Sequence, residues 1–428
     1  MFYVRLSLAS LYNNRRQYTS LFSVCVAGVA IMLAAVTITD GMLRAVRQKA
    51  RQYYGGDLQF MGGYASYDMT DVDQFIDTIS TFTGDDAVFY PRFEYDAHNS
   101  SFYYEGERVR QRIFKGVDFA NEADLFAHVT FVEGNALPIS GQSTILISSP
   151  IAERLGIHAG DSLTLQVHTI YGYTNTMNLI VTGIFQDSSL FGMYTSYIDI
   201  QSLRSVTGYP ANYVNRLCIY YRNGSPSRET VERLQEQLSG SYHLYPLTDD
   251  KNEFYSALSD PATEQPLYAL ITLDANIKDL QILIEAIQSV VILIIVILMA
   301  IISVGIGSTY RVIVMRRITE IGIYRALGMK PEGIRTLFLT ETFFLLLAGC
   351  TAGILLSAAA TGILARFNFS FIPAFDIFLT DGHLMPQVRL AKIAALLGTI
   401  IVTTLLSVLF TIRSAVHISP VGALATTA

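Results

Sequence analysis

The stretch that decides the fold is RVIVMRRITEIGIYRALGMKPEGIRTLFLTE, residues 311–341, which holds six of the thirty Lys and Arg residues. Gly328 and Pro331 break it in the middle, because glycine ends helices readily and proline fits a first helical turn. We therefore predict two helices joined by a rigid elbow; a plain basic loop beside a membrane is the alternative. The apolar face of the first helix recurs every three residues and consists of Ile318, Ile321, Tyr324 and Leu327.

The chain contains four long uncharged runs, and two of them lie directly before and after the elbow. Only 15% of the residues are charged, whereas soluble domains have about 25%. A run of about 20 residues spans a hydrocarbon core of roughly 30 Å at about 1.5 Å per residue. We therefore predict four transmembrane helices, at residues 20–39, 286–310, 342–365 and 393–412.

The distribution of basic residues predicts the orientation of these helices. Basic residues without acidic ones occur in residues 1–19, read as an amphipathic helix, and in the tail at 413–428. Together with the elbow, these segments should face the cytoplasm. The basic cluster after the first run (Arg44, Arg47, Lys49 and Arg51) argues the other way, but long segments translocate regardless of charge. Residues 40–285 and the loop at 366–392 should then be extracytoplasmic, and the first run is an uncleaved anchor.

The large segment between the first two runs has the composition of a folded domain. Residues 41–285 hold 17 Lys and Arg against 30 Asp and Glu, which disfavours nucleic acid as a partner. Strand patterns at 143–148, 162–168, 177–185 and 216–221 alternate with helical patterns at 71–82, 150–155 and 228–238. We predict an α+β domain with two lobes. Its many tyrosines and phenylalanines serve either an apolar groove for lipid or peptide, or core packing.

Sequence motifs for catalysis or cofactor binding are missing from the chain. It contains no Gly-Lys dipeptide, and hence no Walker A loop, and no HExxH, GxSxG or CxxC pattern. We therefore expect no enzyme activity, metal or cofactor in this chain. The four runs also lack ionisable residues, which disfavours channels and proton-coupled pumps. Small residues such as Gly349 and Gly353 favour close helix packing instead.

The elbow motif Arg316–Met329, RRITEIGIYRALGM, followed by Glu341, resembles the FtsX-like permease domain of ABC transporters. That group contains MacB and the lipoprotein-releasing LolC and LolE proteins, and LolC and LolE are the most similar in layout. Further similarity lies at 116–118 with 132–134, in ILISSPIAERLGIHAGD at 145–161, at 181–185 and at 419–424. Tyr324 departs from the usual Leu or Met, and the tail lacks the final Arg of the pattern.

The resemblance implies a mechanotransmission permease with a MacB-like periplasmic core between helices 1 and 2. Two copies of a separate ABC ATPase would bind ATP, and a second permease, identical or related, would complete the assembly. The short elbow helix would dock on the ATPase, with Glu320 and Arg325 as polar contacts and Ile321, Tyr324 and Leu327 as apolar ones. The expected coupling residues are Arg316, Arg317, Glu320, Ile321, Tyr324, Arg325, Leu327, Gly328, Met329 and Lys330.

Extraction of lipoproteins or lipids from the cytoplasmic (inner) membrane is the function that the layout favours, since no ATPase is fused to the chain. Peptide, toxin or drug efflux by a MacB-like permease is the first alternative, and regulation of a cell-wall hydrolase, as by FtsX, is the second. The sequence leaves open the identity of the cargo, the outer residues that touch it, and the need for a periplasmic or outer-membrane partner.

Overall fold

The computed structural model describes residues 2–13, 15–63, 69, 71–137, 142–187, 189–193, 195–259 and 265–415. The chain divides into two compact units. The helical unit comprises Met1–Met42, Ile284–Phe367 and Leu384–Ala428, and the sheet unit comprises Leu43–Leu283 and Asn368–His383. The predicted motif at 419–424 lies outside the described residues.

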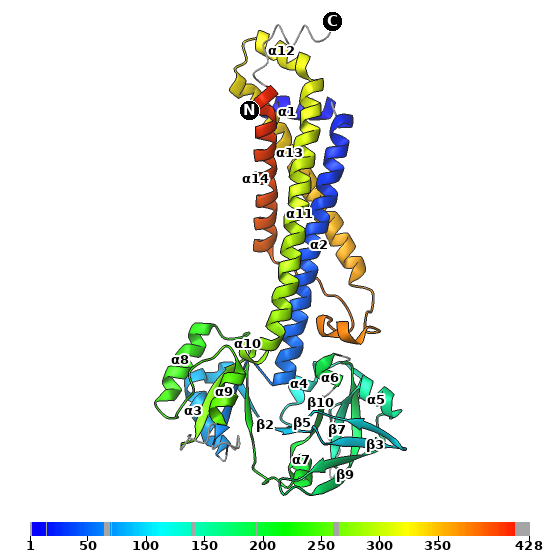
Figure 1. Ribbon diagram of the computed structural model, residues 1–428, viewed down its shortest axis with the longest axis vertical. Helices are drawn as coiled ribbons and strands as arrows, with labels where there is room; N and C mark the ends of the chain where they lie inside the picture. The colour runs from blue at the N-terminus through cyan, green and yellow to red at the C-terminus, as the bar shows by residue number, and fades with distance from the viewer. Residues whose placement is uncertain are drawn as a thin grey trace. The chain divides into compact units, whose positions relative to one another are not determined.

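The helical unit contains four helices that are long and apolar enough to cross a membrane. They run side by side around a shared apolar core (Figure 1). Helices α2, α11 and α14 extend beyond their predicted runs at both ends, whereas α13 extends only at its N-terminal end and stops at Leu364. Their bounds are α2 (Arg15–Tyr54), α11 (Lys278–Arg316), α13 (Pro331–Leu364) and α14 (Leu390–Ala415), and two shorter helices are α1 (Phe2–Asn13) and α12 (Ile318–Ala326).

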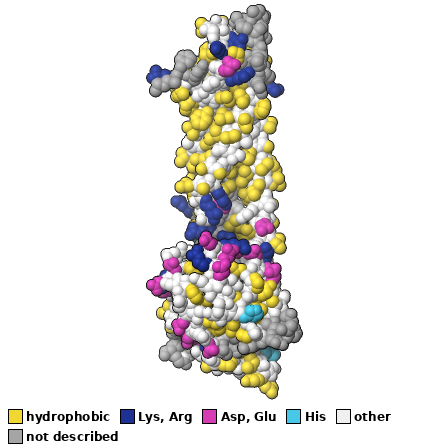
Figure 2. Space-filling model, turned by 90° about the vertical axis from the view of Figure 1, so that its left-hand side faces the viewer, with side chains coloured by type: hydrophobic (Ala, Val, Ile, Leu, Met, Phe, Trp, Pro, Cys, Tyr) yellow, Lys and Arg dark blue, Asp and Glu magenta, His cyan; other side chains and the backbone are white. Residues whose placement is uncertain are grey.

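Large apolar side chains lie on the outside of these helices as well as inside. Ile292 and Val304 of α11 are exposed, and Figure 2 shows hydrophobic side chains over the helical surface. Helices that are apolar on all sides are typical of proteins whose outer surface meets lipid. Inside the unit, Cys25, Val29 and Ile302 are buried. The observed helices are therefore those of a multi-pass membrane protein.

The sheet unit is built on one mixed sheet, whose order among the described strands is β12-β1-β11-β2-β5-β10-β7-β9-β8-β3-β4, with β6 paired to β9. Pairs β5–β10 and β7–β9 are parallel and the other pairs are antiparallel. The strands are β1 (Leu58–Gly63), β2 (Ala87–Asp96), β3 (Ser101–Tyr104), β4 (Glu107–Arg110), β5 (Ile113–Val117), β6 (Phe131–Gly134), β7 (Thr144–Ser148), β8 (Ser162–His168), β9 (Thr174–Phe185), β10 (Thr195–Asp199), β11 (Arg216–Tyr221) and β12 (Leu267–Thr272).

Short helices cover this sheet, so the unit has the α+β architecture that the sequence predicts. The predicted helices at 71–82, 150–155 and 228–238 correspond to three of them within one residue at each end. The helices are α3 (Val72–Thr83), α4 (Ala123–Phe126), α5 (Ser149–Leu155), α6 (Leu190–Met193), α7 (Ile200–Thr207), α8 (Arg228–Ser239), α9 (Lys251–Leu258) and α10 (Leu273–Asn276), with 3-10 turns η1 (Gly84–Asp86) and η2 (Pro373–Phe378).

Two main hydrophobic cores lie along the sheet, in agreement with a two-lobed domain. One is centred on β8 and β9 and the other joins α3 and α8 to β1. Aromatic residues fill much of this space: Phe102, Tyr197 and Tyr220 are buried, whereas Tyr171 and Tyr173 are exposed. Core packing therefore accounts for a large part of the aromatic content of the domain.

The segment between α13 and α14 is divided between the units. Residues 368–383 belong to the sheet unit, so the loop predicted at 366–392 contains parts of both units. Within the sheet unit, Lys49 Nζ lies 2.8 Å from an Asp376 carboxylate oxygen, and the Thr130 hydroxyl donates to Asp381 at 2.7 Å. Polar contacts thus hold this returning segment on the domain.

Candidate functional site

The elbow at 311–341 has the break that its sequence predicts, between Gly328 and Pro331, and a second break at Arg317, because residues 311–316 continue α11. Arg317 interrupts the path from α11 to α12 with φ −101° and ψ 18°. Gly328 ends the short helix with φ +89°, a conformation that residues with a Cβ rarely adopt. Pro331 is the first residue of α13, where its missing N–H costs no hydrogen bond. Local sequence chemistry therefore fixes the C-terminal end of α12.

A buried polar network holds this bend to two other helices of the unit. The guanidinium of Arg317 donates to a Glu341 carboxylate oxygen of α13 at 2.9 Å and to the Tyr18 hydroxyl of α2 at 3.1 Å. The Tyr18 hydroxyl in turn donates to Glu341 at 2.9 Å. Arg317 also bonds Glu320 at 2.7 Å and lies over the ring of Phe338.

The burial of this network makes it most sensitive to loss of Arg317, the one cation that its acceptors share. The side chains of Arg317 and Glu341 are 3% and 0% exposed. Removing one member of a buried ion pair commonly costs about 3–5 kcal/mol, because the other charge stays behind without a partner. The network therefore fixes the place where the chain leaves α11 and hence the direction of α12.

The short helix α12 has one buried face and one open face. Ile321 is 5% exposed and belongs to the core of the helical unit, and Met329 packs against the same core. On the other side Ile323 is 50% exposed, and Leu327, just after the helix, is 80% exposed. An isoleucine and a leucine that face outward next to several cations form a surface suited to a protein partner.

The ten residues predicted for coupling fall into three groups by exposure. Arg316, Leu327, Gly328 and Lys330 are exposed, and Glu320, Tyr324, Arg325 and Met329 are partly buried. Arg317 and Ile321 are buried. Ile321, expected as an apolar docking residue, instead packs inward because the three-residue period drifts around a helix of 3.6 residues per turn.

Glycines of α13 provide close packing against α2. A Cβ on Gly349 would lie 2.7 Å from Cys25 Sγ, and one on Gly353 would lie 2.8 Å from Val29 Cβ. Real Cβ atoms do not approach neighbours this closely, so a larger residue would push the two helices apart. The two glycines thus keep α13 near the helix that carries Tyr18.

Two members of the elbow network had no assigned role in the sequence analysis. Glu341 appeared only as part of the family pattern, and Tyr18 was not singled out. A signal for Glu341 was available, because it is the lone acidic residue at the head of an uncharged run, and such residues usually have a partner. Tyr18 lies 299 positions from Arg317, and nothing local marks it as the third member.

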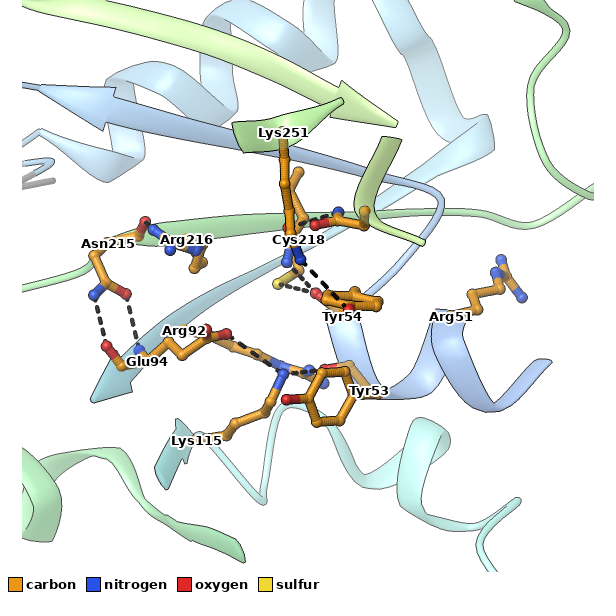
Figure 3. A network of polar contacts seen from close by, with 12 residues as sticks. Arg51, Tyr53, Tyr54, Arg92, Glu94, Lys115, Asn215, Arg216, Cys218 and Lys251 are labelled. Carbon is orange, nitrogen blue, oxygen red and sulfur yellow. Dashed lines mark hydrogen bonds and ion pairs between the residues drawn. The ribbon is translucent and has the colours of Figure 1, made fainter. Parts of the chain in front are cut away.

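A second buried network lies in the sheet unit, where α2 ends (Figure 3). Lys115 of β5 is 2% exposed, donates to the Tyr53 carbonyl and lies 3.4 Å from Glu94. Gln59 donates to the Tyr54 carbonyl. The last carbonyls of a helix lack intrahelical donors, and a cation is favourable there.

The charges of this second network offset each other. Burial lowers the pKa of the Lys115 ammonium, although the carboxylate of Glu94 acts against this shift. Burial also raises the pKa of Glu94, but Lys115 and Arg216 outweigh that effect and lower it overall. The carboxylate and ammonium thus stabilise each other's charged forms, and the cluster attaches the end of α2 to the sheet.

Two parts of the chain match known domain families. Residues 24–238 match the MacB-like periplasmic core domain, and residues 292–420 match the FtsX-like permease C-terminal domain. The chain belongs to the MacB-like periplasmic core domain family. The FtsX-like part of this MacB-type chain contains the elbow with Arg317 and Glu341, and the core-domain match contains Lys115 and Glu94.

Individual relatives cover less of this MacB-type chain. It is 34% identical over 90 residues to the ABC transporter permease YtrF of Bacillus subtilis (strain 168), which is 17% of this chain and 21% of that protein. It thus spans about a fifth of the length of this relative. The periplasmic region of MacB from Actinobacillus actinomycetemcomitans matches with a TM-score of 0.31 and 8% identity, covering 54% of this chain and 95% of that one.

Proposed function

We propose that the chain is the permease subunit of an ABC transporter and works with a separate ATPase. The family matches across both halves of the chain support this, together with four helices suited to a membrane. In this proposal ATP binds only to the ATPase, because the sequence has no Walker A loop. The protein then resides in the inner membrane, with the elbow and termini cytoplasmic and the sheet unit extracytoplasmic.

The observation that carries the proposal is the form of the elbow. Its short helix presents Ile323 and Leu327 outward, while Arg317 and Ile321 anchor it inside the helical unit. A helix that is anchored rigidly and exposes an apolar tip can bind a partner protein and transmit the partner's movement to the other helices. We infer that Leu327 enters a groove of the ATPase and that Arg316 and Lys330 lie at the polar rim of that interface.

Movement of the ATPase would then be transmitted through the helices to the sheet unit. The boundary between the two units falls within α2 and within α11, so each of these helices is continuous from one unit into the other. Lipoproteins or lipids are the proposed cargo, since uncharged helices offer no polar path through the bilayer. The MacB-like core-domain match favours efflux of peptides, toxins or drugs as the second candidate.

The partner assignment is tested by co-purification. Tagged protein isolated in mild detergent should bring down an ATPase, and Leu327→Asp should reduce its recovery at least about tenfold, because an apolar contact would be replaced by a buried charge. Leu137→Asp is the matched control, since Leu137 is an exposed leucine of the sheet unit. Equal ATPase recovery with both variants, or no ATPase in the wild-type sample, would overturn the proposal.

The cargo is tested separately with purified full-length protein. A lipoprotein substrate carrying its acyl chains and the same protein without them are compared for binding in detergent. Preferential binding of the acylated form supports extraction of lipoproteins. Equal binding of both forms, or binding only of soluble peptides, supports efflux instead.

A further inference from the structure

A hollow of about 610 Å³ in the sheet unit combines arginines with apolar side chains. One wall is a single face of α2 with Arg44, Arg47, Gln48 and Arg51, which follow the spacing of successive helical turns. The lining also includes Arg228, at the start of α8, which is already paired with Glu232 at 3.0 Å and with Asp249 at 3.7 Å. Small-molecule sites commonly have volumes of about 300–1,000 Å³, so the hollow is large enough for a ligand.

The arginines of the hollow differ in whether they have an acidic partner. The Asp57 side chain is fully buried. Its carboxylate accepts hydrogen bonds from the Arg51 guanidinium at 2.9 and 2.6 Å and from the Ser225 hydroxyl at 2.6 Å. Arg47 pairs with Asp274 at 3.1 Å, but both side chains are more than half exposed, and such pairs contribute only about 0–1 kcal/mol. Arg44 is exposed and has no ion pair or hydrogen bond with any residue that the structure describes. A positive charge is therefore available at one end of the hollow.

The position of Arg44 along α2 matches the depth of lipid headgroups. The uncharged run of this helix ends at Thr39, five residues earlier, which is about 7–8 Å along the helix axis. Headgroup layers add roughly 5–8 Å on each side of the hydrocarbon core. A membrane span that ends at Thr39 would therefore place Arg44 at headgroup depth and Arg47 about one turn further out.

We propose that this hollow binds the headgroup of an anionic phospholipid, with Arg44 and Arg47 on the phosphate. A lipid phosphate displaces Asp274 from Arg47 at little cost, since that pair is exposed. Leu58 and Leu273 also line the hollow and supply apolar surface for the glycerol carbons. The site also gives a role to the basic cluster after the first run, which contains Arg44 and Arg47. Basic residues are expected mainly in cytoplasmic segments, whereas this cluster is extracytoplasmic in the proposed topology. It does not depend on the ATPase partner proposed above.

The experiment compares lipid binding by the full-length protein in neutral detergent. Phosphatidylglycerol, phosphatidylcholine and soluble sn-glycerol 3-phosphate are titrated as three separate probes, and bound lipid is counted by native mass spectrometry. The variants are Arg44→Gln and Arg44→Gln with Arg47→Gln. Arg233→Gln is the control, since Arg233 is an exposed arginine of α8 whose only described ion pair is with Glu229.

Phosphatidylglycerol should bind more tightly than phosphatidylcholine, and each lost arginine should weaken it about fivefold. The control should bind as the wild type does. All variants should retain the wild-type circular dichroism, since these arginines are exposed. Equal affinity for the two lipids, or unchanged phosphatidylglycerol binding by the double variant, would overturn the proposal. Tighter binding of glycerol phosphate than of the lipid would overturn the lipid assignment.

Discussion

The two buried charge networks of the molecule are built differently. In the helical unit one cation, Arg317, is shared by Glu341, Glu320 and the Tyr18 hydroxyl. In the sheet unit cations and anions alternate, with Arg92 paired to Glu122 and Lys115 near Glu94. The first network joins three helices at one point, whereas the second extends across neighbouring strands and reaches the end of α2.

This difference shows two uses of buried charge. A single arginine with several acceptors fixes one direction, that of the short elbow helix, and tolerates the loss of one acceptor better than the loss of the arginine. Paired charges within a sheet leave each ion dependent on one main partner. We therefore expect the sheet network to suffer more from loss of a single carboxylate, and the following experiments test that ranking.

The largest effect is expected for Glu122→Ala in the sheet unit. The side chains of Arg92 and Glu122 are 5% and 1% exposed, so the change leaves a buried guanidinium without its carboxylate. The free energy of unfolding should fall by about 3–5 kcal/mol, measured by denaturant titration in detergent with circular dichroism. Glu229→Ala, which removes an exposed pair with Arg233, is the control and should cost less than about 1 kcal/mol. Similar losses in both variants would contradict the ranking.

A smaller effect is expected for Glu341→Gln in the helical unit. The amide keeps an acceptor for Arg317, and Glu320 remains at 2.7 Å, so the loss should be about 1.5–3 kcal/mol. The distinguishing measurement is amide hydrogen exchange over residues 317–330, which should become faster because α12 loses its anchor. If exchange there is unchanged, Glu341 does not hold the elbow.

Lys115→Met should cost about 1–3 kcal/mol, because it leaves the Tyr53 carbonyl without the donor that it now has. The loss is limited because Met fills a similar volume and Arg216 still offsets the charge of Glu94. Thermal unfolding of Lys115→Met, of Glu94→Leu and of the double variant gives the coupling between the two residues. Additive losses would show that the pair does not act as a unit.

The smallest effect concerns a surface pair that serves as a baseline for both networks. His158 Nδ1 lies 3.0 Å from Glu133. This hydrogen bond raises the pKa of the imidazole above 6.5, and the bonds from His158 and the Ala159 amide lower the pKa of Glu133 below 4.5. The contribution of His158 to the free energy of unfolding is complete below pH 6.5 and is lost as the pH rises through its folded pKa. The glutamate contribution is complete above pH 4.5 and is lost as the pH falls.

The pair should therefore stabilise the protein most between pH 4.5 and 6.5. His158→Gln should lower the unfolding temperature slightly at about pH 5.5 and less at about pH 8. Both groups are exposed, so the difference should be far below that of either buried network. A greater difference at the higher pH would show that the sign is wrong.

Sequence reasoning located the elements that depend on local chemistry. Gly328 and Pro331 mark the break in the elbow because each has a special backbone preference, and the four apolar runs correspond to the four long helices. It did not find Tyr18 as a partner of Arg317, because that contact depends on how distant helices pack. Ile321 was expected to dock on the partner but is buried, because a three-residue pattern drifts around α12 and does not show which of its residues face inward.

The segment at 368–383 has a consequence for synthesis of the protein. It belongs to the sheet unit, yet the ribosome makes it about 85 residues after Leu283, the end of the main part of that unit. The contact of Lys49 with Asp376 joins residues 327 positions apart. The sheet unit therefore reaches its final state only after three of the four long helices have been made. A stall in translation before Asp376 should leave the domain without this segment and Lys49 without its Asp376 partner.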